Sequence, residues 1–149
     1  MLDNVLTGAL FSAKGGGRTL AEARALCEEP LRLTGLAGQA HVPAGTLTLG
    51  GRKKLELARV LATEPRLLLL DEVMGGLTPP EIEDLMATLK RIHASGTTIV
   101  MIEHVLHAIM GLCSHVFVLN FGRELFQGTP QDVVRHPEVI AAYLGKPLG

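Results

Sequence analysis

Two adjacent acids at the end of a short apolar run are the strongest chemical signal in the sequence. Residues 67–70 are four leucines, and Asp71 and Glu72 follow them directly. In open α/β sheets, ligands bind beyond the carboxyl ends of the strands. Asp71 could hold Mg²⁺ there through water, and Glu72 could orient or deprotonate a water that attacks a terminal phosphate. The alternative is that both acids only solvate the strand end and cap the next helix.

A glycine pair at a predicted helix start is a second candidate site. Thr48, Gly50 and Gly51 stand at this start, and three cations, residues 52–54, follow at once. Cations oppose the helix dipole at an N-terminus, whereas bare backbone N–H groups attract an anion. A phosphate bound at Gly50 and Gly51 would reconcile the two. The alternative is a solvated basic first turn.

Residues 75–80, with the sequence GGLTPP, form a predicted tight loop between the acids and the next helix. Thr78 can cap the helix that Pro79 or Pro80 opens. Such a loop can also be purely structural.

His104 follows a second apolar run, residues 97–102, and Glu103. At the carboxyl edge of a sheet, a histidine can hydrogen-bond a terminal phosphate and report its presence. The alternatives are a polar surface residue or a metal pair with His107, with His115 nearby. No acid or cysteine completes a recognisable metal-ligand spacing around them.

Residues 12–19, SAKGGGRT, are similar to the sequence pattern of a phosphate loop but do not match it. Ser12 replaces the first glycine of the pattern G-x-x-x-x-G-K-[ST], and Arg18 replaces the lysine. The preceding residues have helical spacing, whereas a phosphate loop follows a buried strand. We therefore predict a turn between helices.

The pattern of apolar residues around these candidate sites predicts an α/β fold. Helical spacing predicts helices at about 2–13 and 19–33 and one from about 51 to before Pro65, with a loop at 35–46. Apolar strands at 67–70 and 97–102, separated by a helix at about 80–95, are typical of a parallel sheet covered on both faces. Shorter strands at 116–120 and 124–127 and helices at about 130–135 and 137–144 follow. The predicted division is a helical part, 1–64, and an α/β part, 65–149.

Composition restricts the partners. The chain has 149 residues, 47% of them hydrophobic, and a net charge of −1, so it can bury a core and has no overall field for nucleic acid or anionic membranes. Cys27 and Cys113 lie far apart and predict neither a disulfide nor a zinc site. No apolar run is long enough to span a membrane, and no signal peptide is recognisable. Any work at a membrane is expected of a peripheral subunit.

Read in order, four segments resemble the ATP-binding subunit of ABC transporters. They are LTLGGRKKLELAR (47–59), LLLLDE (67–72), GGLT (75–78) and MIEH (101–104). The resemblance equates residues 47–51 with the family's signature sequence, 67–71 with its Walker B motif, Glu72 with the catalytic carboxylate, 75–78 with the D-loop and His104 with the switch histidine. The tail at 128–145 is similar to that of branched-chain amino-acid importers, and related urea importers and lipopolysaccharide exporters share parts of it. Val73, Thr78 and Val105 depart from the family pattern.

This resemblance implies a P-loop NTPase fold in truncated form, a helical signature subdomain followed by a parallel-sheet portion. It implies ATP and Mg²⁺ as cofactors, with no metal beyond Mg²⁺, and a site shared with a second ATPase subunit. Thr48, Gly50 and Gly51 would contact the γ-phosphate of ATP held by the partner, next to the D-loop residues Gly76 and Thr78. Transmembrane permease subunits are further implied partners, and nucleic acid is not. The implied location is cytoplasmic, on the inner face of the cell membrane.

The family's first strand, phosphate loop, adenine-stacking aromatic residue and loop glutamine have no counterpart in this sequence. We therefore expect the C-terminal part of such a subunit, which alone neither binds ATP tightly nor hydrolyses it. We also expect the incomplete sheet to expose an apolar edge and face. The alternative is a naturally short, non-catalytic partner that lends its signature loop to a complete ATPase.

Overall fold

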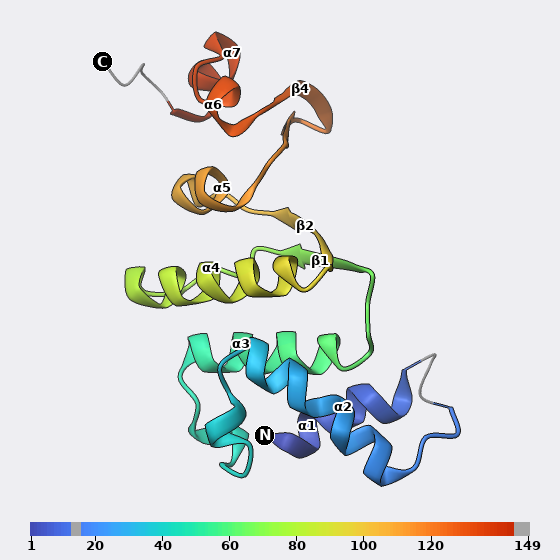
Figure 1. Cartoon of the computed structure of the whole chain (residues 1–149). Helices are drawn as coiled ribbons and strands as arrows, with labels where there is room; N and C mark the ends of the chain where they lie inside the picture. The colour runs from blue at the N-terminus through green and yellow to red at the C-terminus, as the bar shows by residue number, and fades with distance from the viewer. Residues whose placement is uncertain (13–15, 145–149) are drawn as a thin grey trace. The chain divides into compact units, whose positions relative to one another are not determined.

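The computed structural model describes residues 1–12 and 16–144, which form two compact units that divide between Ile102 and Glu103. The first unit contains helices α1–α4 and strands β1 and β2, and the second contains the remaining elements (Figure 1). The division predicted at 64/65 follows the change in secondary structure rather than these contacts and stays a prediction.

Three helices build the first part of the first unit: α1 (Leu2–Phe11), α2 (Leu20–Leu33) and α3 (Leu49–Leu61). Thr19 and Glu22 form a capping box that fixes the start of α2. Thr48 caps α3, so this helix begins two residues earlier than predicted. The predicted loop at 35–46 contains two single helical turns, Ala37–Gln39 and Ala44–Thr46.

These three helices share one apolar core. It includes the fully buried side chains of Val5, Ala9, Ala23, Cys27 and Ala58. The small residues allow close approach: a Cβ added at Gly8 of α1 would lie 2.1 Å from the carbonyl oxygen of Arg59 in α3. The backbone of α3, which carries Thr48 and the glycine pair at its start, is therefore seated directly against α1.

Strands β1 (Leu67–Asp71) and β2 (Thr98–Ile102) pair in parallel and are connected through α4 (Pro79–Ala94). This strand–helix–strand order confirms the predicted crossover unit. Leu68 and Leu70 of β1 are buried, as are Leu85, Leu89 and Ile92 of α4. Figure 1 shows α4 running alongside α3. The register places Asp71 opposite Ile102, so both strands end at the same edge.

One face of this sheet is uncovered. Leu69 is 69% exposed and Ile102 is 65% exposed, and Leu67 and Val100 on the same face are about half exposed. Within the first unit, no other described element supplies a layer over this face. The expectation that the incomplete sheet exposes an apolar face is confirmed for this unit.

The second unit is a hairpin with short helices. It contains α5 (Leu106–Leu112), the antiparallel strands β3 (Val116–Asn120) and β4 (Arg123–Gly128), α6 (Pro130–Val133), α7 (Pro137–Val139) and a wide helical turn, Ile140–Leu144. Phe121 and Gly122 have φ values of 47° and 76°, the conformation of a tight two-residue hairpin turn. Val118, Val133 and Val139 form its small core. Across the described residues of both units, the helices are too short or too polar to cross a bilayer.

Candidate functional site

The two predicted acids lie where β1 ends. Asp71 is the last residue of the strand, and the Glu72 N–H donates to the Ile102 carbonyl oxygen at 2.9 Å. Glu72 has a φ of 45°, in the left-handed region that costs a non-glycine residue about 1 kcal/mol or more. The chain thus turns sharply at Glu72, and both acids are exposed at the carboxyl edge of the sheet. Strain of this kind is common at functional sites and is invisible in the sequence.

The side chains at this edge fit a Mg²⁺ ion that has one carboxylate ligand from the protein and keeps most of its water ligands. Asp71 supplies carboxylate oxygens, which are hard ligands suited to this ion. Among residues 1–12 and 16–144, no three histidine, cysteine or acidic side chains gather as a metal site. The residues present therefore fit an ion held mainly by water and phosphate, with one carboxylate from the protein, and do not fit a closed protein cage.

The glycine pair at the start of α3 forms a compact turn, residues 48–52, which we call the α3 turn. The Thr48 hydroxyl oxygen accepts from the Gly51 N–H at 3.2 Å, and the Arg52 N–H donates to the Thr48 carbonyl oxygen at 2.9 Å. The Gly50 N–H donates to Oε1 of Glu81 at 3.3 Å. Both glycine amides of the predicted phosphate site thus have acceptors within the chain, one of them an anion.

Glu81 belongs to this site and was not among the residues predicted from the sequence. Its Oε2 accepts from the Thr78 N–H at 3.0 Å and from the Thr78 hydroxyl at 2.9 Å, forming a capping box at the start of α4. These bonds, followed by those from Gly50 and Thr48, lower the pKa of the Glu81 carboxyl below its ordinary value. The sequence held a signal, because Thr78-Pro-Pro-Glu81 has the S/T-x-x-E spacing of a capping box.

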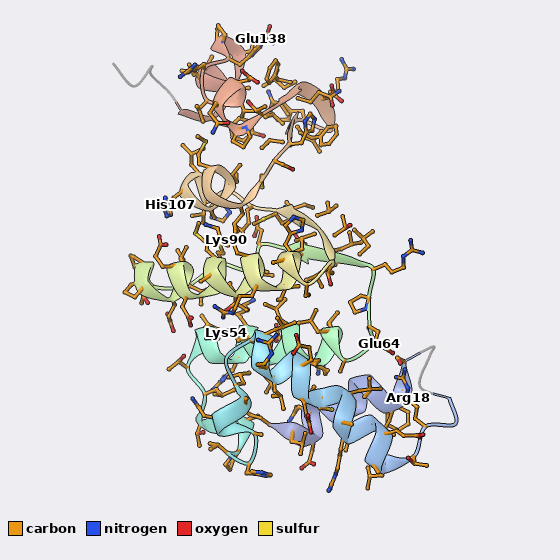
Figure 2. All side chains as sticks on the ribbon, viewed as in Figure 1. Arg18, Lys54, Glu64, Lys90, His107 and Glu138 are labelled. Atoms are coloured by element: carbon orange, nitrogen blue, oxygen red, sulfur yellow. The ribbon has the colours of Figure 1, made fainter. Side chains whose placement is uncertain are left out.

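The loop at residues 75–78 packs against the α3 turn. Gly76 has a φ of 77°, and a Cβ added there would lie 3.2 Å from a methyl group of Leu49. One helical turn further on, Lys54 of α3 pairs with Asp84 of α4 at 2.5 Å. Figure 2 shows Lys54 on the side of α3 that faces α4. The structure therefore brings together all five residues predicted to contact nucleotide: Thr48, Gly50, Gly51, Gly76 and Thr78.

His104 belongs to the second unit, where it follows the end of β2 by two residues. Its predicted contact with a terminal phosphate stays a prediction. His107 lies in α5, and His115 stacks edge-on against Phe117 with ring centroids 5.0 Å apart. No histidine of the described residues belongs to a cluster of three metal-ligating side chains.

The segment that imitates a phosphate loop is partly described. Residues 13–15 lie outside the described residues, and the element before them, α1, is a helix, as predicted. Arg18 donates to the Ala9 carbonyl oxygen at 3.2 Å and pairs with Glu64 at 2.5 Å (Figure 2). Arg18 thus connects the end of α1 to the residues after α3, which supports a structural role for this segment.

Known proteins similar to this chain are transporter ATP-binding proteins. The family described as "branched-chain amino acid ATP-binding cassette transporter" matches residues 123–147. The branched-chain amino acid transport ATP-binding protein BraF of Pseudomonas aeruginosa is 38% identical over 144 residues, 96% of this chain and 56% of BraF. LivG of Escherichia coli, named for the same transport, is 40% identical over 119 residues, 78% of this chain and 46% of LivG. The chain thus spans about half the length of these curated relatives.

Solved structures give the same family of folds. The chain matches cbiO1 of Clostridium perfringens, part of an ABC transporter complex, with a TM-score of 0.80 and 31% identity over 93% of this chain and 54% of that one. An ATP-binding cassette of another ABC transporter matches with a TM-score of 0.80 and 24% identity, covering 95% of this chain and 61% of that one. The expected P-loop NTPase fold is confirmed by these structures.

Proposed function

Because this chain belongs to the family of ABC transporter ATP-binding subunits, we propose that it supplies the signature and carboxylate parts of an ATP site that energises solute import. The observation that carries the proposal is the packing of the α3 turn against the 75–78 loop within one unit. Two separate sequence motifs predict that residues of these two segments contact nucleotide. Their convergence is what a shared phosphate site requires.

In the proposed role, the α3 turn serves ATP that is held by a second ATPase subunit. The exposed Thr48 hydroxyl and the Gly50 and Gly51 N–H groups stand at a helix N-terminus, which favours the negative charge of a γ-phosphate. Gly76 and Thr78 lie beside this turn and complete the contact surface. A pair of subunits in symmetrical arrangement would use the same surface twice.

The acids at the end of β1 serve the chemical step. Mg²⁺, when bound, neutralises charge on the phosphates, and Asp71 would hold it through water. Glu72 would orient and deprotonate the attacking water, since its backbone turn presents the side chain beyond the strand end. His104 would hydrogen-bond the terminal phosphate in the same cycle.

The solute proposed for the parent transporter is a branched-chain amino acid, as named for BraF and LivG. Permease subunits in the membrane are the further partners, and the chain would act at the inner face of the cell membrane. The comparisons do not favour the alternative of a short, non-catalytic chain, because the relatives that cover this chain are named as ATP-binding proteins.

The proposal is tested by ATP hydrolysis in two forms of the protein. The 149-residue chain alone is expected to show no Mg²⁺-dependent turnover, since no phosphate loop is recognisable in its sequence. The same chain fused behind the phosphate-loop half of LivG is expected to hydrolyse ATP. Turnover by the chain alone, or none by a folded fusion that binds ATP, would contradict the proposed division of roles.

Substituting Glu72→Gln in this fusion is expected to abolish steady turnover by at least about 100-fold while ATP binding is retained, because the amide cannot accept the proton of the attacking water. Glu83→Gln, which removes an exposed acid from α4, is the matched control and is expected to leave turnover unchanged. Retained turnover in Glu72→Gln would exclude this residue as the general base.

A further inference from the structure

Glu81 accepts hydrogen bonds from two residues that the proposed function assigns to nucleotide. Two of these bonds come from the N–H and hydroxyl groups of Thr78, and one comes from the Gly50 N–H. The backbone of Gly50 also lies in van der Waals contact with the side chain of Glu81. A Cβ added at Gly50 would lie 3.0 Å from Oε1 and 3.2 Å from Cγ of Glu81.

The carboxylate of Glu81 stands where an anionic ligand is expected. The N-terminus of α3 favours negative charge, and residues 52–54 add three cations to its first turns. Lys54 is paired with Asp84, and the Arg52 side chain donates to the Leu47 carbonyl oxygen at 3.2 Å. The acceptor at the Gly50 amide is the Glu81 carboxylate, contributed by a helix 31 residues along the chain.

The two carboxylate oxygens of Glu81 accept hydrogen bonds from different residues. Oε2 accepts both bonds from Thr78 and caps α4, whereas Oε1 accepts from Gly50. At 3.3 Å the Gly50 bond is the longest of the three. Removing Oε1 from Gly50 therefore leaves the α4 cap in place, so the carboxylate can give up the α3 turn without unfolding either helix.

We propose that Glu81 is an internal competitor for the phosphate site: its carboxylate holds the Gly50 N–H until a nucleotide phosphate displaces it. This inference rests on the proposed function, since it concerns the same turn. The displacement couples phosphate at the α3 turn to the 75–78 loop, because the group that leaves Gly50 remains bonded to Thr78 in that loop. Glu81 acts as a positioning residue and touches no reacting atom.

The test is a titration of the 149-residue chain with inorganic tripolyphosphate, followed through the backbone amide resonances of Gly50 and Gly51. Glu81→Gln removes the negative charge but keeps the capping box, which accepts glutamine as well as glutamate. Glu81→Ala removes both, and far-UV circular dichroism checks that each variant is folded. Glu83→Gln removes one charge from the same helix and is the matched control.

We expect tripolyphosphate to bind Glu81→Gln and Glu81→Ala about five times more tightly than the wild-type chain and Glu83→Gln, with the Gly50 resonance moving most. Equal affinity in the wild-type chain and Glu81→Gln would overturn the competition while leaving the proposed phosphate site intact. An equal gain in Glu83→Gln would also overturn it, because general charge would then be the cause. Absence of binding in every variant would also overturn the competition, whereas the proposed ATP site, which is shared with a subunit that holds the ATP, is tested separately by the fusion protein.

Discussion

The close approach of α1 to α3 gives a prediction with two opposing terms. Gly8 lies inside α1, and replacing glycine by alanine in a helix interior normally stabilises it by about 1 kcal/mol. Here the new methyl group would lie 2.1 Å from the Arg59 carbonyl oxygen and 3.1 Å from its carbon. Both are backbone atoms, so no side-chain rotation can relieve the contact.

We expect the steric cost of the added methyl group to exceed the gain in helix propensity. Real Cβ contacts are essentially never shorter than 3.0 Å, so the two helices would have to separate by roughly 1 Å in a close-packed core. Overpacking of this kind costs about 1 to 3 kcal/mol, and the loss of contacts around Val5 and Ala58 adds to it. Subtracting about 1 kcal/mol of helix propensity leaves up to about 2 kcal/mol of overpacking, and with the lost contacts we expect Gly8→Ala to lower the free energy of unfolding by about 1 to 2 kcal/mol.

Urea unfolding followed by circular dichroism at the helix band measures this change, and the chain has no tryptophan to serve as an alternative probe. Gly45→Ala is the control, because a Cβ there has nothing within 4 Å, and it is expected to change stability by less than about 0.5 kcal/mol. If Gly8→Ala is as stable as the wild-type chain or more so, helix propensity dominates and the inferred seating of α3 against α1 is wrong.

Two further predictions concern the open sheet face and acid stability. Leu69→Lys places a charge on the exposed apolar face and is expected to lower self-association, measured by sedimentation velocity. Leu70→Lys places the charge at a side chain that is 7% exposed and is expected to unfold the chain. Unchanged self-association in Leu69→Lys would show that this face does not mediate it. Bonds from Thr19 hold the pKa of Glu22 below its ordinary 4.5, so this stabilisation is complete above that pH and is lost as the pH falls through the lower folded value. The Tm of the wild-type chain should therefore fall more steeply below 4.5 than that of Glu22→Gln, and parallel curves would refute this linkage.

Local sequence signals predicted most elements. The strand at the four-leucine run, the helix that follows it and the Thr78 cap of that helix all depend on residues within a few positions of each other. The start of α3 was predicted two residues late because the leucine before the glycines already has helical geometry once Thr48 caps it. A continuous apolar run tells which residues avoid water but not whether a second layer is present, so the structure was needed to show which face of the sheet is uncovered within the first unit.

For the candidate site, the residues proposed to contact phosphate and Mg²⁺ could be chosen from the sequence, because motif order and residue chemistry are carried by short segments. The contact of the α3 turn with the 75–78 loop, and the place of Glu81 between them, became apparent from the folded chain. The tertiary structure also decided that Glu72 sits in the left-handed region and that Arg18 pairs with Glu64. These contacts join residues far apart in the chain, and helix packing rather than local propensity determines which of them meet.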